Sequence, residues 1–333
     1  MKNRFSNIAT SVLLTSVLFT SCDTIFTVDT PTASIPETIT ITETGLYPEG
    51  VDFNNTTNEF VVGSIVRSEI GTINPQTGVY TNLVTDAGLA SVTGVFTDEY
   101  RNRLIAASGN LGFSTNSAQN ANPLAYLGIY NLETGAILQG INLGALLPEG
   151  TPVFANDIAL DDYGNIYVTD SFSPVIYRVD GTTYEASILI SNQDFAPAPG
   201  AFGLNGIEFI NGNLIVNKLD DGRLFRIPVS NPEAYVVIDA QTYVGADGLE
   251  LTADGDIILV ENDLGENPGT HLLRSTDNWA SATEVSSFAV TGGRFPTTAA
   301  LASDGNVYVI NAYLSLALGG DLTQETFSIL RVQ

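Results

Sequence analysis

A repeated strand–turn–strand unit is the feature that most restricts the fold of this chain. Short apolar segments are separated by turns such as Asn211-Gly212, Asp254-Gly255 and Asp304-Gly305. Asn-Gly and Asp-Gly pairs favour two-residue hairpins, because both central residues of such a turn adopt positive φ. A short apolar strand precedes each turn and a strongly β-forming strand follows it, as Ile207-Glu208-Phe209 and Leu214-Ile215-Val216 flank the first of these turns. The pattern predicts a repeated antiparallel sheet.

Six copies of the unit can be aligned on the second residue of their first strands. These residues are Glu49, Thr93, Asn156, Asn205, Asp247 and Thr297, and successive ones lie between 42 and 63 residues apart. A β-propeller blade takes roughly 40–50 residues, and the one long step contains an Asn/Ser-rich insertion, Ser108 to Asn122. The sequence therefore predicts an all-β, six-bladed β-propeller. A β-sandwich is the main alternative, but it does not account for six copies.

The segment before the first copy predicts how the ring closes. Residues Glu37-Thr38-Ile39-Thr40-Ile41-Thr42 form a strand that belongs to no copy, whereas the last copy is about one strand short. We expect this N-terminal strand to pair with the last blade, because the pairing would remove two exposed sheet edges. The propeller domain is therefore predicted to span residues 37–333.

The N-terminus has the pattern of an export signal. Lys2 and Arg4 precede an uncharged, mainly apolar stretch, Ile8 to Phe19, which is too short to span a bilayer. It ends in Leu18-Phe19-Thr20-Ser21-Cys22, which resembles a bacterial lipobox. Residues 1–22 are predicted to be a lipoprotein signal peptide with Cys22 as the lipidation site, and residues 23–36 a flexible tether. The alternative is an incidental or buried cysteine. We expect an exported protein, lipid-anchored at a bacterial membrane, periplasmic or on the cell surface.

Composition excludes several classes of function. The chain has 37 Asp and Glu against 12 Lys and Arg, a net charge of −25, which repels nucleic acid and favours divalent cations. One Cys and one His exclude internal disulfides, CxxC redox pairs, HExxH zinc sites and histidine dyads. We expect no nucleic-acid partner, contact with the membrane only through the lipid anchor, a small-molecule ligand or substrate, and a monomer.

The six aligned residues are candidates for chemistry. The first strand of each blade lines the central channel, so equivalent positions form a ring around the axis. We call Glu49, Thr93, Asn156, Asn205, Asp247 and Thr297 the oxygen ring, because every member carries a side-chain oxygen. Carboxylate and amide oxygens are the ligands that calcium prefers, and two carboxylates would cancel its charge. The alternative is that Asn and Asp are common in turns and at strand ends.

Four segments of the chain resemble the regucalcin/gluconolactonase family of six-bladed propellers, to which diisopropyl fluorophosphatase is related. They are Pro48-Glu49-Gly50, Asn156-Asp157-Ile158-Ala159-Leu160 with the Gly164–Ser171 block, Leu204-Asn205-Gly206 and Ala246-Asp247-Gly248, within residues 45–315. In that family a Glu, two Asn and an Asp surround the catalytic divalent cation. The resemblance implies that Glu49, Asn156, Asn205 and Asp247 are metal ligands, and that Asp247 is also the catalytic base or nucleophile.

The chain departs from this family at one informative place. Gluconolactonase-type members hold a sugar acid with an Arg just before the first of the two Asn, where this chain has Val153-Phe154-Ala155. Paraoxonase-like relatives use a histidine pair, which a single His cannot supply. The departure puts a sugar-lactone substrate in doubt and indicates a more apolar pocket. The resemblance thus implies a calcium-dependent hydrolase of lactone or ester type. The alternatives are a non-catalytic binding propeller stabilised by calcium and a metal-free interaction scaffold.

Three further features have plainer interpretations. His271 is expected to be a surface or hydrogen-bonded structural residue, and Trp279 a packing or surface residue. The insertion from Ser108 to Asn122 is either a loose loop or a lid over one end of the channel.

Overall fold

The computed structural model describes residues 34–122 and 124–332. The predicted signal peptide with Cys22, and the tether up to residue 33, lie outside the described residues. In the described part of the chain no helix is long and apolar enough to cross a membrane.

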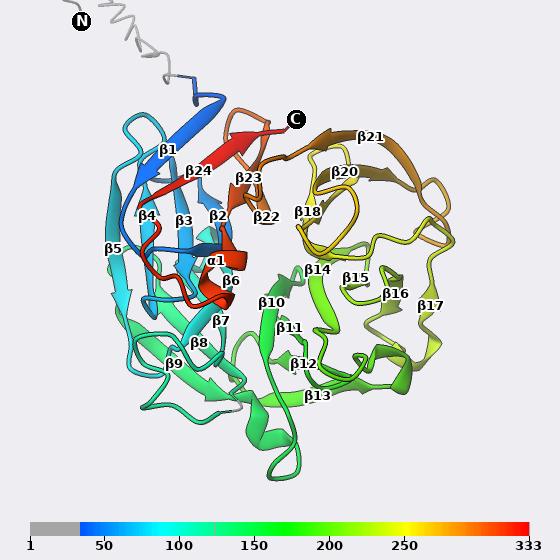
Figure 1. Cartoon of the computed structure of the whole chain (residues 1–333). Helices are drawn as coiled ribbons and strands as arrows, with labels where there is room; N and C mark the ends of the chain where they lie inside the picture. Colours follow the sequence, from blue (N-terminus) through cyan, green and yellow to red (C-terminus); the bar gives the residue numbers. More distant parts are fainter. Residues whose placement is uncertain (1–33, 123, 333) are drawn as a thin grey trace, which may run out of the picture. The chain divides into compact units, whose positions relative to one another are not determined.

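Six four-stranded antiparallel sheets are arranged in a ring around a central axis (Figure 1), so the predicted six-bladed propeller is confirmed. Blade 1 contains β2 (Pro48–Asn54), β3 (Glu59–Ser64), β4 (Glu69–Ile73) and β5 (Tyr80–Thr85). Blade 2 contains β6 (Ser91–Asp98), β7 (Arg103–Gly109), β8 (Tyr126–Asn131) and β9 (Ile137–Asn142). Blade 3 contains β10 (Ala155–Leu160), β11 (Ile166–Asp170), β12 (Val175–Val179) and β13 (Ala186–Ser191).

The second half of the ring repeats this plan. Blade 4 contains β14 (Leu204–Ile210), β15 (Asn213–Lys218), β16 (Leu224–Pro228) and β17 (Val236–Val237). Blade 5 contains β18 (Ala246–Leu251), β19 (Ile257–Glu261), β20 (Gly269–Arg274) and β21 (Thr283–Ala289). Blade 6 contains β22 (Pro296–Leu301), β23 (Val307–Asn311), β24 (Thr326–Arg331) and β1 (Thr38–Thr42). Within residues 34–122 and 124–332 the helices are one α-helix, α1 (Leu314–Leu318), and the 3₁₀ helices η1 (Glu99–Arg101), η2 (Leu143–Leu146), η3 (Gln193–Phe195) and η4 (Pro232–Ala234).

The ring is closed by the N-terminal strand, as the sequence predicts. β1 pairs antiparallel with β24, with Ile39 opposite Ile329 and Ile41 opposite Phe327. The alternation of Thr and Ile in β1 places both isoleucines in the core and the threonines outside. Ile35 is also buried, so the packed part of the chain extends slightly ahead of β1.

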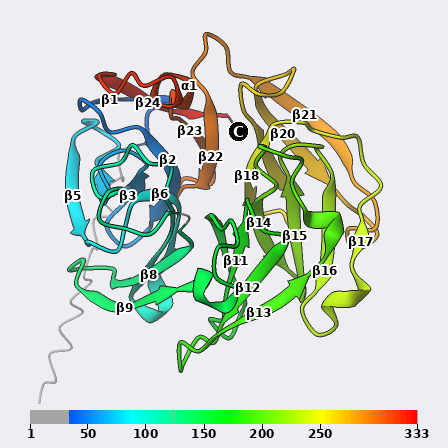
Figure 2. The same ribbon diagram turned by 60° about the horizontal axis from the view of Figure 1, so that its bottom comes forward.

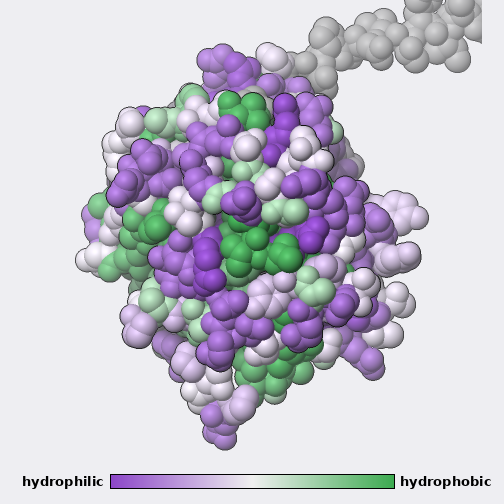
Figure 3. Space-filling model, turned by 90° about the vertical axis from the view of Figure 1, so that its right-hand side faces the viewer, coloured by the Kyte–Doolittle hydropathy of each residue, from purple (hydrophilic) through white to green (hydrophobic). Residues whose placement is uncertain are grey.

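The burial of the strands changes from the axis outward. The second strands are buried on both faces, because each sheet is packed between two neighbouring blades. Because both faces of these strands are buried, their sequences are continuous apolar runs such as Ile257-Ile258-Leu259-Val260. The outermost strands β9 and β21 are exposed along nearly their whole length. The side of the molecule on the right of Figure 1 is mostly hydrophilic, with apolar patches between polar side chains (Figure 3).

All six first strands share an irregularity at the same place. In each blade the register with the second strand shifts across the oxygen-ring position, as between Leu204 and Ile207 in β14. A bulge of this kind re-aims side chains locally. The residue after the ring position is glycine in four blades, because a side chain there would clash with the backbone of the next blade. A Cβ on Gly206, for example, would lie 2.4 Å from the carbonyl oxygen of Asp247. The first strands therefore crowd closely around the axis (Figure 2).

Candidate functional site

The structure brings the predicted ligands together at one end of the central channel, which we call the ring mouth. Glu49, Thr93, Asn156, Asn205 and Asp247 line a single cavity and come from the first strands of blades 1 to 5. All five are buried, with at most 5% of each residue exposed. The sixth member of the oxygen ring, Thr297, is also buried but lies outside this lining.

The backbone carbonyls of the four predicted ligands are fixed by side chains of the preceding blade. The bonds are Thr297 Oγ1 to Glu49 O at 2.7 Å, Thr93 Oγ1 to Asn156 O at 2.8 Å, Thr169 Oγ1 to Asn205 O at 2.6 Å and Asn217 Nδ2 to Asp247 O at 2.5 Å. Thr93 and Thr297 therefore position their neighbours through hydrogen bonds. Because these bonds join adjacent blades, the ring is held in place before any ligand arrives.

Two side chains that directly follow the second strands orient the ligands of their own blades. Asn156 donates from Nδ2 to Ser171 Oγ at 2.9 Å, and Ser171 in turn donates to the carbonyl of Leu204 at 2.7 Å. This leaves Oδ1 as the atom of Asn156 available to a cation. Asn262 donates from Nδ2 to Asp247 Oδ2 at 2.7 Å. Ser171 and Asn262 both lie 15 residues after the ring member that they contact.

The carboxylates of this site are in an unfavourable environment unless a cation is present. Burial raises the pKa of Glu49 well above its usual value, and the charges of Asp247 and Asp157 raise it further. Burial also raises the pKa of Asp247 to about 7, although hydrogen bonds from Asn262 and Asn205 lower it. The oxygen Oε2 of Glu49 is buried and has no hydrogen-bond partner among the described residues. A buried acceptor without a partner is costly, so this oxygen is a candidate ligand for a cation.

The donor set fits calcium better than the other common ions. In the described part of the chain no group of three or more His, Cys, Asp and Glu side chains is placed to hold a metal. The candidate ligands are two carboxylates and two amides, all oxygen donors, and together they balance a charge of +2. Calcium accepts six to eight oxygens in flexible geometry, whereas zinc prefers nitrogen and sulfur. The remaining coordination positions would be open to water or a substrate.

Apolar side chains cover the oxygen ring, a feature that we call the apolar cap. It consists of Ile65, Leu111, Phe113, Phe154, Phe202, Leu219, Leu264, Phe295, Leu314 and Leu318. The cap leaves a cavity of only about 50 Å³. Leu111 and Phe113 belong to the insertion after β7, which therefore reaches the ring mouth. The insertion is bonded to blade 1, since Thr115 N donates to Val66 O at 2.8 Å.

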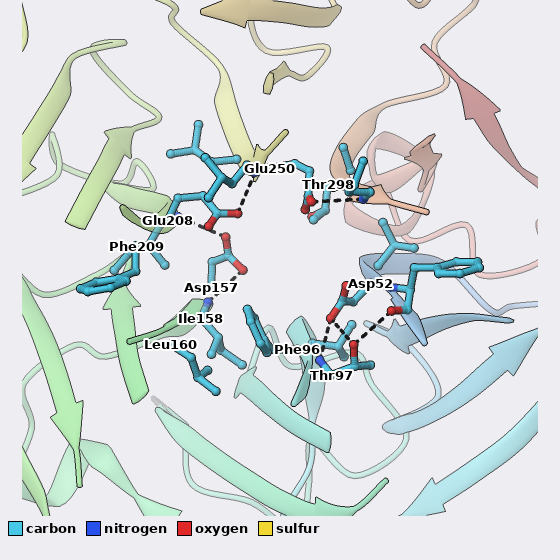
Figure 4. A pocket seen from close by; sticks show the side chains of 18 of the residues that line it. Asp52, Phe96, Thr97, Asp157, Ile158, Leu160, Glu208, Phe209, Glu250 and Thr298 are labelled. Atoms are coloured by element: carbon cyan, nitrogen blue, oxygen red, sulfur yellow. Dashed lines mark hydrogen bonds between the residues drawn. The ribbon is translucent and has the colours of Figure 1, made fainter. Parts of the chain in front are cut away.

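The other end of the channel, which we call the acidic mouth, is a wider cavity of about 500 Å³. Six carboxylates line it: Glu99 and Asp162, and the four that Figure 4 labels, Asp52, Asp157, Glu208 and Glu250. Each of these four accepts a backbone N–H from the first strand of the next blade, at Thr97, Ile207, Leu251 and Leu301 respectively, at 2.6 to 3.2 Å. Burial raises the pKa values of Asp52, Asp157 and Glu208 to about 6, 7 and 8, and that of Glu250 well above its usual value.

His271 and Trp279 lie in blade 5, away from the oxygen ring. His271 is buried between two carboxylates, with Nδ1 3.1 Å from Glu284 Oε2 and Nε2 3.1 Å from Glu261 Oε2, and it packs on Tyr243. Trp279 is buried in a hydrophobic cluster of this blade. These contacts agree with structural roles for both residues.

Sequence reasoning missed the residues that support the ring, although the repeat contains a signal for them. Ser171 and Asn262 occupy equivalent places just after the second strands of blades 3 and 5, and Thr169 and Asn217 occupy equivalent places within the second strands of blades 3 and 4. Aligning the second strands as closely as the first would have selected all four. The apolar cap follows the repeat only in part: Ile65 and Leu219 share the position of Ser171 and Asn262, whereas Leu111 and Leu318 come from an insertion and a short helix.

Comparisons with known proteins agree on the fold. No family model and no curated protein sequence matches the chain. Among solved structures, the major Malassezia sympodialis allergen Mala s 1 is 19% identical with a TM-score of 0.72, over 90% of this chain and 97% of that one. Regucalcin from Agrobacterium tumefaciens is 16% identical with a TM-score of 0.56, over 86% and 91%. A gluconolactonase from Xanthomonas campestris is 12% identical with a TM-score of 0.59, over 89% of each chain.

Proposed function

We propose that this protein is a calcium-dependent hydrolase of the lactone or ester type, with its metal at the ring mouth. The observation that carries the proposal is the unpartnered, buried Oε2 of Glu49, facing a cavity that Asp247, Asn156 and Asn205 also line. Structural neighbours described as regucalcin, a calcium-binding protein, and as gluconolactonases support it through their shared fold. Glu49, Asn156, Asn205 and Asp247 would hold the calcium ion.

When bound, calcium would supply Lewis-acid polarisation of the substrate oxygen and charge stabilisation for the oxyanion that develops. Asp247 would take the proton from the attacking water, or attack the carbonyl carbon directly. Asn262 keeps the Asp247 carboxylate in one orientation through its hydrogen bond to Oδ2. The apolar cap excludes bulk water from the reacting atoms.

Calcium-dependent turnover of a panel of lactones and esters tests the proposal. We expect activity that is lost on chelation and restored by calcium, and at least about 10³-fold lower kcat in an Asp247→Asn variant. An inactive wild type across the panel, or an Asp247→Asn variant with full activity, would contradict a catalytic role.

A second candidate, a non-catalytic propeller that uses the same calcium for stability or ligand display, is favoured by the apolar cap. The cap leaves a cavity of about 50 Å³ over the ring, too small for a substrate without side-chain movement. This candidate predicts calcium-dependent thermal stability without turnover. In either case we propose a monomeric, exported lipoprotein, attached through Cys22 to a bacterial membrane and either periplasmic or on the cell surface. Mass spectrometry of the N-terminal peptide from native membranes tests the lipid at Cys22.

A further inference from the structure

The apolar cap is built by the whole propeller. Its side chains come from all six blades: Ile65 in blade 1, Leu111 and Phe113 in blade 2, Phe154 in blade 3, Phe202 and Leu219 in blade 4, Leu264 in blade 5, and Phe295, Leu314 and Leu318 in blade 6. Ten apolar residues over a floor of polar ones give this cavity two chemical zones. A ligand that fills it needs a polar end for the floor and an apolar body for the cap.

The cavity is unsuited to an anionic ligand. Among the described residues that line it there is no Lys or Arg, and the only charged side chains are Glu49 and Asp247. The charge of a bound divalent cation would be balanced by these two carboxylates, so no net positive charge would remain to pair with an anionic ligand. A carboxylate on the ligand would therefore be desolvated without an ionic partner, which is unfavourable.

The cavity is equally unsuited to a ligand rich in hydroxyl groups. Three of the polar donors at its floor already have an acceptor in the protein: Asn156 Nδ2 donates to Ser171, Asn262 Nδ2 to Asp247, and the Thr93 hydroxyl to the carbonyl of Asn156. Sugar hydroxyls would face phenylalanine and leucine side chains without partners.

An aromatic cluster replaces the Arg that the resemblance would place before Asn156. Phe154 contacts Phe172 and Phe202 with ring centroids 5.0 and 5.6 Å apart, and Phe172 and Phe202 are 5.1 Å apart. Gly109 makes room for this arrangement, because a Cβ at that position would lie 2.2 Å from Cδ2 of Phe154. The local sequence thus fixes an aromatic wall where a sugar-acid site would need a cation.

The rim of the cap can open. Leu264 and Leu318 line the cavity but are 56% and 51% exposed, so few contacts hold their side chains in one rotamer. Movement of these two side chains widens the cavity without moving a strand. The apolar body of a ligand would then restore the burial of the rim.

We propose that the apolar cap binds the uncharged acyl or aryl part of an apolar lactone or ester, with the ester group directed to the oxygen ring. This substrate class rests on the proposed function, but the binding of the apolar part can be measured without turnover. Selectivity follows from the cap: alkyl or aryl lactones are accepted, and polyhydroxylated or anionic lactones are rejected.

The test uses the full chain with calcium and N-phenyl-1-naphthylamine, a neutral apolar fluorophore, as the probe. Unbranched δ-lactones with side chains from methyl to heptyl, and glucono-δ-lactone with the same ring, compete with it. We expect the alkyl lactones to displace the probe with an affinity that rises about four-fold per methylene until the cap is filled. Glucono-δ-lactone is expected not to displace it at concentrations that saturate the heptyl compound.

Two matched pairs of variants locate the binding. Phe202→Ala and Leu318→Ala, in the cap, are each expected to weaken probe binding about ten-fold. Phe209→Ala and Leu316→Ala are the controls: Phe209 lines the acidic mouth in the same blade as Phe202, and Leu316 is in α1 with Leu318 but outside the cavity lining. Leu318 is half exposed, so its truncation is not expected to unfold the protein.

The outcomes separate this inference from the proposed function. Two results together support the inference, even if no lactone is hydrolysed. The alkyl lactones displace the probe with an affinity that follows their chain length, and probe binding depends on Phe202 and Leu318. Hydrolysis confined to polyhydroxylated or anionic lactones overturns it while the proposed function stands. The inference also fails if the probe does not bind, if glucono-δ-lactone competes as well as the alkyl lactones, or if the control variants weaken binding as much as the cap variants.

Discussion

The two ends of the central channel both gather carboxylates from the same first strands, yet their chemistry differs. At the acidic mouth, Asp52, Glu208 and Glu250 lie three residues after the ring positions of their blades, and each accepts a backbone N–H of the next blade. At the ring mouth, Glu49 has a buried oxygen that accepts no hydrogen bond. Asp52, Glu208 and Glu250 thus link neighbouring blades through hydrogen bonds, whereas Oε2 of Glu49 makes no such bond.

The number of acidic residues is therefore a poor guide to a metal site in this fold. The acidic mouth has six carboxylates and a cavity of about 500 Å³, whereas the ring mouth has two carboxylates and a cavity of about 50 Å³. Unsatisfied oxygens and fixed amide ligands mark the site better than charge does, because a cation is needed only where acceptors lack donors. Four variants or conditions test this contrast.

The largest effect is expected from Glu49→Gln, which removes the unpartnered carboxylate and keeps its shape. Calcium affinity measured by isothermal titration calorimetry should fall by more than about 10²-fold, beyond the loss typical of residues that only support a ligand. Glu250→Gln, at the acidic mouth, should leave the affinity within about two-fold of wild type, because its Leu301 N–H bond can still form. Equal losses in the two variants would show that only the overall charge of the channel matters.

The fold and the first strands of the site could be predicted from the sequence because the repeat is carried by local signals. The turns, the β-forming second strands and the unpaired segment at 37–42 determined the number of blades and the closing strand β1. The same alignment placed Glu49, Asn156, Asn205 and Asp247 on one axis, and the structure gathers them around one cavity. Their role as metal ligands stays a prediction.

The supporting hydrogen bonds and the apolar cap could not be predicted, because they depend on contacts between segments whose spacing varies from blade to blade. Thr297 and Glu49 are 248 residues apart in the chain and meet only because the ring closes. Leu111 reaches the cavity from an insertion and Leu318 from a short helix, and neither has a counterpart in the repeat. Asp52, Glu208 and Glu250 at the acidic mouth occupy a recurring position of the repeat. Their backbone partners belong to the neighbouring blade, however, and the sequence alone does not show which residues of two blades will be hydrogen-bonded.

Calcium should stabilise the folded protein if the ring mouth is its site. Free calcium at 100 times its Kd adds about 2.7 kcal/mol to the free energy of unfolding, because only the folded ring assembles the ligands. Differential scanning calorimetry should show a higher Tm in calcium than in chelator for wild type and for Glu250→Gln. Glu49→Gln should show no such difference. A calcium shift that survives in Glu49→Gln would place the stabilising ion elsewhere.

A smaller loss is expected when a support of the ring is removed and every ligand is kept. Asn262→Ala removes the donor to Asp247 Oδ2, and calcium affinity should fall about 10- to 100-fold. Asn311→Ala is the matched control, because Asn311 is also a buried Asn at the end of a second strand but donates to Ser328. If both variants lose the same calcium affinity, general destabilisation of the blades explains the loss, and Asn262 has no special part in holding Asp247.

The smallest effect concerns the acidic mouth and its response to pH. Burial raises the pKa of Glu208 from 4.5 to about 8, so the folded chain binds a proton there that the unfolded chain has already lost. This contribution to stability is complete below about pH 4.5 and disappears as pH rises through about 8. In chelator, Glu208→Gln should match wild type near pH 5 and exceed it at pH 8.5 by on the order of 1 kcal/mol, or about 2–4 °C in Tm. Glu133→Gln, at an exposed position, should show no such gain. A Glu208→Gln protein that tracks wild type at both pH values would mean that the bond to Leu251 N already compensates the charge, and the acidic mouth would then be as well satisfied when ionised as when protonated.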